Sequence, residues 1–260
     1  MERAQFIFVL VMAGLLAASC GGGGGGAEPA ADEAPAPAAD AKPAPDLSQA
    51  GSVSGMVSFG GDTPKNARLR MDADPVCVKE HSGIVRSQDV LIGDGGALIN
   101  TFVWVKSGLE QYGFDTPSDP VTLDQKGCIY TPHVLGIQTR QKLHVLNSDG
   151  TTHNVHPLPR NNREWNQSQR AKGKPLVRSF PRAEVMIPVK CNVHPWMKAY
   201  IGVVPHPYYA VTGTDGAFSI ENLPPGDYVI EAWHEKFGVQ EQQVTVQASE
   251  AKEVSFEFSG

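Results

Sequence analysis

The sequence predicts an all-β protein built from two β-sandwich domains. Strand-like runs, in which apolar and polar residues alternate, recur from residue 51 to residue 260 and are separated by Gly, Pro, Asn and Asp. No segment in this range has the apolar repeat of an amphipathic helix. The folded part of roughly 210 residues is long enough for one large or two modest domains.

The chain begins with "MERAQFIFVLVMAGLLAASC", in which Arg3 precedes an apolar run over residues 6–18. That run is shorter than the about 20 residues that a membrane span needs and is typical of a secretory signal. Its end, "LLAASC", resembles a bacterial lipobox. The resemblance implies that residues 1–19 are a lipoprotein signal peptide and that Cys20 is lipidated. A signal peptide cut elsewhere is the alternative.

Lipidation would anchor an exported protein to a membrane without a spanning segment. Gly21 rather than Asp follows Cys20, which by resemblance to bacterial lipoproteins favours the outer membrane. We therefore expect the protein in the periplasm or at the cell surface. Residues 20–50 are rich in Gly, Ala and Pro and have almost no large apolar side chain, so they predict a disordered tether.

Residues 51–94 are predicted to be an N-terminal β segment, because Val53, Val57 and Phe59 lie on one face of an alternating run. The metal-bearing domain is predicted over residues 95–205. Its first strands are the β-rich run "FVWV" from residue 102 and the run "LHVLN", which ends in a polar turn.

A strand before Cys191 directs the thiol of this residue into the core. Val185, Ile187 and Val189 alternate on one face, and Cys191 falls on the same face. Pro188 lies on the other face and indicates a sheet edge or an irregularity of the strand.

Residues 206–260 predict a second β unit. "TGTDGAF" followed by "PPGDY" resembles the transthyretin-like regulatory modules of carboxypeptidases. The resemblance implies a small β-sandwich without a catalytic role. Such modules open with a G-x-V-x-G-x-V strand, and "GSVSGMVSF" near residue 51 is similar. Two arrangements therefore stay open: a sandwich split by the metal-bearing domain, or two consecutive domains.

Two short stretches contain the residues of a candidate metal site. "NSDGTTHNVH" places His153 after a polar turn, and "CNVHPWM" contains Cys191, His194 and Met197. Two imidazoles, one thiolate and a nearby thioether are the ligands of a type 1 copper site. This set of ligands suits both oxidation states of copper, so it predicts single-electron transfer.

Together the two stretches resemble the cupredoxins, the blue-copper proteins, and amicyanin in particular. That family has an H-N-V-H stretch upstream of a C-x-x-H-P-x-M loop. The resemblance covers residues 95–205 and implies a Greek-key β-sandwich holding one copper ion. It implies four ligands: His153, Cys191, His194 and Met197.

The same resemblance assigns roles to three residues around the copper. Asn154 matches the residue whose backbone N–H points at the thiolate sulfur. Pro195 and Trp196 match the apolar surroundings of the loop histidine, with Trp196 as an aromatic shield. In cupredoxins this histidine reaches the surface, so the resemblance implies that His194 is exposed within an apolar docking patch.

The four cysteines can be assigned without a spare thiol. If Cys20 carries lipid and Cys191 binds metal, Cys77 and Cys128 are left to form a disulfide in an oxidising compartment. If these two thiols are free instead, Cys77 and His81 in "CVKEH" become a candidate second metal site.

The other histidines are not expected to bind the metal. His156 lies three residues from His153 on a predicted strand and so faces the opposite side. We expect His133 and His144 to be structural or exposed residues. His206 and His234 are expected on the surface.

Several functional classes are disfavoured. The net charge of −6 argues against a nucleic-acid partner. Zinc suits Cys and His but not Met. The loop lacks the second cysteine of a dinuclear copper centre, and the chain lacks the His-x-His pairs of a multicopper oxidase. We therefore expect no enzymatic activity and no small-molecule substrate.

The predicted function is single-electron transfer between redox proteins by a lipid-anchored blue copper protein. A copper store or chaperone and a cell-surface binding module are the alternatives. Basic residues in the segment 157–184 predict a surface that steers an acidic partner, such as an acidic c-type cytochrome or a dehydrogenase. A solvated loop is the other interpretation. These basic residues are Arg160, Arg163, Arg170, Lys172, Lys174, Arg178 and Arg182.

Overall fold

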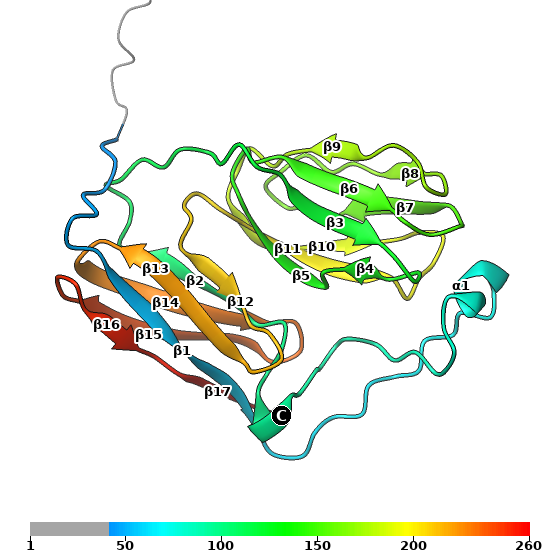
Figure 1. Cartoon of the computed structure of the whole chain (residues 1–260), viewed down its shortest axis with the longest axis horizontal. Helices are drawn as coiled ribbons and strands as arrows, with labels where there is room; N and C mark the ends of the chain where they lie inside the picture. The colour runs from blue at the N-terminus through cyan, green and yellow to red at the C-terminus, as the bar shows by residue number, and fades with distance from the viewer. Residues whose placement is uncertain (1–41) are drawn as a thin grey trace, which may run out of the picture. The chain divides into compact units, whose positions relative to one another are not determined.

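The computed structural model describes residues 42–260 (Figure 1). The predicted signal peptide, the lipidation of Cys20 and most of the tether lie outside these residues. In the part that is described, no helix is long and apolar enough to cross a membrane.

Strands make up nearly all of the regular structure, which confirms the all-β prediction. The exceptions are the five-residue helix α1 (Pro75–Lys79) and the 3₁₀ turn η1 (Asp94–Gly96). The strands are β1 (Gly51–Gly60), β2 (Phe102–Ser107), β3 (Val121–Gln125), β4 (Tyr130–Thr131), β5 (Val134–Gln138), β6 (Leu143–Asn147), β7 (His153–Pro157), β8 (Gln167–Gln169), β9 (Leu176–Arg178), β10 (Glu184–Lys190), β11 (Lys198–Val204), β12 (Tyr209–Val211), β13 (Ala217–Leu223), β14 (Gly226–His234), β15 (Gly238–Val246), β16 (Ala251–Glu253) and β17 (Phe256–Ser259).

The strands form two pairs of sheets, each pair with its own apolar core. Strands β3 to β11 form one pair, with the orders β5-β11-β10-β7-β8 and β4-β3-β6-β9. Their shared core includes Leu123, Val145, Ile187 and Ile201. Both stretches of the candidate metal site belong to this β3–β11 unit.

The other pair of sheets combines the two ends of the described chain. In one sheet β1 pairs with β13, β16 and β17, and in the other the order is β12-β2-β14-β15. The alternating side chains Val53 and Val57 of β1 are fully buried in this core. Gly55 is required because a Cβ there would lie 1.7 Å from the carbonyl oxygen of Val254.

The structure moves one boundary that the sequence suggested. The sequence predicts that the run from residue 102 belongs to the metal-bearing domain over residues 95–205. As β2 it pairs instead with β14 and β12, with Val105 opposite Ile230 and Val103 opposite Ala210. A short β-rich run carries no information about which sheet it joins, because the pairing partner is distant in sequence.

The strand that leads to Cys191 is irregular but does not lie at a sheet edge. Strand β10 pairs with β11 on one side and with β7 on the other. The register shifts between Glu184 and Ile187, where Met186 adopts a positive φ of 62°. Pro188 lies just beyond this bulge, and its carbonyl accepts a bond from the Leu158 N–H.

The connection between β1 and β2 folds back on itself as a loop over residues 66–90, which we call the cap loop. The Asn66 side chain donates to the Val90 carbonyl and accepts from the Val90 N–H, and the Leu69 N–H donates to the Val85 carbonyl at 2.9 Å. The loop contains α1. This helix was not predicted from the sequence, although "DADP" places an N-cap Asp before a first-turn Pro.

A buried carboxylate connects the β3–β11 unit with β14. Glu235 follows β14 and accepts bonds from His133, from Lys198 Nζ at 2.7 Å and from the Tyr200 hydroxyl at 3.1 Å. Asp89 of the cap loop bonds the same lysine at 2.5 Å. Burial alone would raise the pKa of Glu235, but the bonds from His133 and Lys198 outweigh it and lower the pKa.

We expect this carboxylate to make the protein sensitive to acid. A pKa lowered in the folded state stabilises the protein above the ordinary pKa of a glutamate, and that stabilisation is lost as the pH falls through the folded value. The free energy of unfolding, measured with urea between pH 7 and pH 3, should therefore fall less steeply with pH in Glu235→Gln than in the wild type. Equal slopes would contradict this role.

Candidate metal centre

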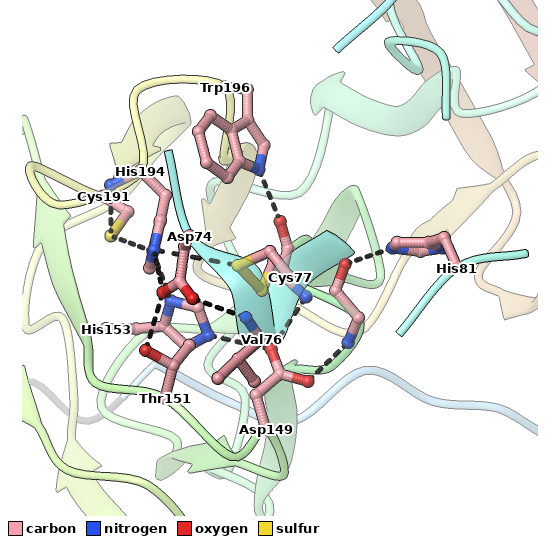
Figure 2. The surroundings of a disulfide bond; sticks show 12 residues. Asp74, Val76, Cys77, His81, Asp149, Thr151, His153, Cys191, His194 and Trp196 are labelled. Carbon is pink, nitrogen blue, oxygen red and sulfur yellow. Dashed lines mark hydrogen bonds and ion pairs between the residues drawn. A yellow bond between two sulfur atoms is a disulfide. The ribbon is translucent and has the colours of Figure 1, made fainter. Parts of the chain in front are cut away.

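Three potential ligands converge in the interior of the β3–β11 unit (Figure 2). His153 begins β7, Cys191 follows β10, and His194 lies in the loop between β10 and β11. One ligand atom from each residue lies within 4.8 Å of the others. The two Nδ1 atoms are 2.8 Å apart, and the Cys191 Sγ lies 3.9 Å from the His194 Nδ1. All three side chains are almost completely buried.

The thiol is held in surroundings that favour its charged form. Its sulfur accepts bonds from the backbone N–H of His194 at 3.3 Å and of Asn154 at 3.5 Å. Burial would raise the pKa of Cys191, but the bond from His153 and these backbone donors lower it. The Asn154 N–H thus points at the Cys191 sulfur.

The loop from Cys191 to Met197 is a closed turn. The Cys191 N–H donates to the Met197 carbonyl at 3.3 Å, and the Met197 N–H donates to the His194 carbonyl at 2.9 Å. The side-chain oxygen of Asn154 accepts from the N–H of Asn192 at 2.6 Å. Met197 is 1% exposed and belongs to the same apolar cluster as Cys191. The loop therefore buries the thioether in the same apolar core as the thiol.

A carboxylate fixes the outer edge of the His153 ring. Asp149 Oδ2 accepts the His153 Nε2–H at 2.8 Å and the Cys128 N–H at 2.8 Å. Burial opposes a charged imidazole, but Asp149 and the Cys191 sulfur raise the pKa of His153 to about 9. The ring therefore has its Nε2 fixed by Asp149 and its Nδ1 turned toward the His194 Nδ1.

A second carboxylate, from the cap loop, contacts the outer edge of the His194 ring. Asp74 Oδ2 lies 3.1 Å from the His194 Nε2 (Figure 2). Burial lowers the pKa of His194, and the charged His153 beside it adds to this effect, while Asp74 opposes it. Neither Asp74 nor Asp149 was predicted from the sequence. The only available signal for Asp149 was its position four residues before His153.

The structure contains the disulfide between Cys77 and Cys128, with a Cα–Cα distance of 5.5 Å. Both cysteines are fully buried, and the Cys77 Sγ lies 3.8 Å from the His194 Nε2. The alternative second metal site at Cys77 and His81 is not present, since the cysteine is bonded and the His81 Nε2 contacts the Gly127 carbonyl at 2.7 Å. The disulfide attaches the cap loop to the chain before β4.

The expected exposure of His194 was wrong. This residue is 2% exposed, because Asp74 and the disulfide cover the edge of its ring. Trp196 is partly buried against the cap loop cluster and donates its Nε1–H to the Cys128 carbonyl at 2.9 Å. Pro195 is exposed. The apolar patch around an exposed histidine is therefore replaced by a covered site.

The remaining histidines lie away from the three ligands. His156 faces the other side of β7 and contacts Glu164 at 2.6 Å. His144 is partly buried on β6, and His133 contacts Glu235. The expected exposure of His206 and His234 was wrong, since they are 4% and 1% exposed. Burial lowers the pKa of each to about 4, and each packs against aromatic rings.

The chain is similar to several known proteins. Residues 195–259 match the family of carboxypeptidase regulatory-like domains. No curated protein sequence matches the chain. Among solved structures, the copper-containing nitrite reductase from Thermus scotoductus SA-01 is similar, with 15% identity and a TM-score of 0.31. That match covers 56% of this chain and 28% of the reductase chain.

Two smaller proteins are also similar in structure. Amicyanin from Paracoccus versutus is 19% identical with a TM-score of 0.29, and the match covers 39% of this chain and 96% of amicyanin. A purple cupredoxin from Nitrosopumilus maritimus is 18% identical with a TM-score of 0.28, and the match covers 32% and 97% of the two chains.

Proposed function

We propose that the protein binds one copper ion through His153, Cys191 and His194, with Met197 as a weak axial ligand, and carries single electrons between redox proteins. The observation that carries this proposal is the convergence of two imidazole Nδ1 atoms on a buried thiol whose pKa is lowered. Such a set of donors, with a thioether in the same cluster, suits copper better than zinc. Copper bound there would accept and release one electron.

The residues around the three ligands support rapid electron transfer by keeping the ligands in place. Asp149 and Asp74 each hold one imidazole from its outer edge, and two backbone N–H groups hold the sulfur. Ligands fixed by such partners move little when the charge at the centre changes. The buried position also excludes water from the thiol, which protects it from oxidation.

The visible and electron paramagnetic resonance spectra of the copper-loaded protein test the proposal. We expect an intense blue absorption and reversible one-electron cycling. A colourless copper complex, or a preference for zinc over copper in competition, would contradict it. The covered His194 disfavours the chaperone alternative, because a chaperone must release its metal readily.

Export and lipid anchoring through Cys20 remain part of the proposal and are tested by the membrane association of Cys20→Ala.

We further propose that the basic segment 157–184 steers an acidic redox partner. Strand β8 of this segment pairs with β7, and Gln169 lies opposite the proposed ligand His153. Arg170 is the next residue in the chain after Gln169. Arg163, Arg170 and Lys172 are exposed. Within residues 42–260 these three form no ion pair, so their charge is available to a partner.

Reversing Arg163, Arg170 and Lys172 to Glu should slow electron transfer from an anionic reductant at low salt. Hexacyanoferrate(II) serves as the probe, with rates measured by stopped flow. We expect a decrease of roughly 10-fold, the lower end of steering effects, which shrinks in 1 M salt because the Debye length falls to about 3 Å. The cationic hexaammineruthenium(II) should react faster with the same variant.

A matched control changes the net charge equally at another place. The control uses three residues outside the basic segment, namely Arg140, Lys142 and Lys252. Arg140 and Lys142 precede the start of β6, and the chain reaches His153 only after the far end of β6. Their reversal to Glu should leave both rates nearly unchanged. Equal effects of the two triple variants would mean that only net charge matters and that the segment does not steer.

A further inference from the structure

The cap loop brings one carboxylate into contact with a proposed ligand. Asp74 Oδ2 accepts the His194 Nε2–H at 3.1 Å and the Thr151 hydroxyl at 2.8 Å (Figure 2). The Asp74 side chain is 19% exposed, whereas that of His194 is 3% exposed. The carboxylate therefore lies between the imidazole and solvent.

Two independent features hold this carboxylate in place. Asp74 Oδ1 accepts the Val76 N–H at 2.8 Å as the N-cap of α1, which fixes the side chain relative to the helix. Cys77, in the same helix, is joined to Cys128 by the disulfide, which fixes the helix relative to the β3–β11 unit. Met71 of the cap loop and Trp196 add apolar packing on this side.

The contact determines which nitrogen of His194 faces the ligand cluster. When the Nε2–H donates to Asp74, the Nδ1 of the neutral ring carries a free electron pair. That Nδ1 lies 2.8 Å from the His153 Nδ1 and 3.9 Å from the Cys191 Sγ. Asp74 thus selects the tautomer and the ring orientation that a metal at this cluster requires.

We propose that Asp74 is a positioning residue of the metal centre and that the disulfide-anchored cap loop is a fixed part of that centre. The proposal rests on the proposed copper function. Asp74 acts through the His194 ring by accepting its Nε2–H. The covered ring also means that the metal is released slowly, because the cap loop must move before His194 can turn outward.

Copper affinity tests the role of the hydrogen bond. Asp74→Ala should bind Cu(I) about 10- to 100-fold more weakly than the wild type in competition with bicinchoninate, as is typical when a partner of a ligand histidine is removed. Asp74→Asn has one acceptor oxygen in place of two, so at these positions it can accept the His194 N–H or cap α1 but not both, and its affinity should lie between those of the wild type and Asp74→Ala. Asp72→Ala, an exposed position of the same loop, is the matched control and should bind as the wild type does.

The metal-free protein gives a second readout. Long-range proton–nitrogen spectra should show His194 as the Nε2–H tautomer in the wild type and as a tautomer mixture in Asp74→Ala. Unchanged far-ultraviolet circular dichroism would show that each variant is folded.

The possible results separate this inference from the proposed function. Equal copper affinities of the wild type and Asp74→Ala would overturn the positioning role alone. A wild-type protein that binds no copper would overturn the proposed function together with the inference.

Discussion

Cys191→Ser should abolish the blue absorption of the copper-loaded protein completely. In the proposed site the colour arises from charge transfer between the thiolate and copper, and a serine hydroxyl has no equivalent transition. Cys191 is the one cysteine within residues 42–260 that is not in a disulfide, so another thiolate cannot replace it there. The visible spectrum of the copper-loaded variant measures the effect.

Met197→Leu is the matched control for this substitution. It keeps the thiolate and both imidazoles and replaces the buried thioether by a side chain of similar volume. The variant should stay blue, with a higher reduction potential, because a weak axial donor is lost. A Cys191→Ser protein that stayed blue would refute the assignment of the thiolate ligand.

Removal of the disulfide should produce the largest loss of stability. The bond joins residues 51 positions apart, and a closure of this size contributes about 2–4 kcal/mol to the free energy of unfolding. We expect the double variant Cys77→Ala and Cys128→Ala to unfold at a correspondingly lower urea concentration, measured by circular dichroism in the metal-free protein.

Cys191→Ala is the control for the disulfide variant, because it removes a buried sulfur without opening a covalent loop. Its effect should be clearly smaller. If the double variant lost less than about 1 kcal/mol, well below the usual disulfide contribution, the cap loop would be held mainly by its other contacts. Those contacts are the apolar cluster around Met71 and the bonds of Asp74 and Asp89.

The periodic strands were predictable because each carries its own evidence. Alternation over Val185, Ile187 and Val189 placed Cys191 in the core, and all but Val185 are nearly completely buried. Local motifs also brought His153, Cys191 and His194 forward as candidates. Their convergence follows from the pairing of β7 with β10, which residue spacing alone does not determine.

The cap loop was not predictable in the same way. Its covering of His194 depends on contacts between residues more than a hundred positions apart, such as Asp74 and His194. A loop with mixed charges and little periodicity gives no sign of the surface that it will contact. The burial of His206 and His234 was missed for a similar reason, since His206 bonds the distant Val105 carbonyl and His234 also packs against Phe258 of β17.

The position of β1 and β2 has a consequence for the order of folding. Both strands are made early, yet β1 can pair only with β13, β16 and β17, and β2 only with β12 and β14. The β3–β11 unit needs no strand after residue 204 and is complete in sequence before these partners emerge. Because contacts of large sequence separation form slowly, we expect this unit to fold first. The cap loop lies between β1 and β2, but its partners Cys128, Thr151 and His194 belong to the β3–β11 unit, so the loop can be anchored as soon as that unit has formed.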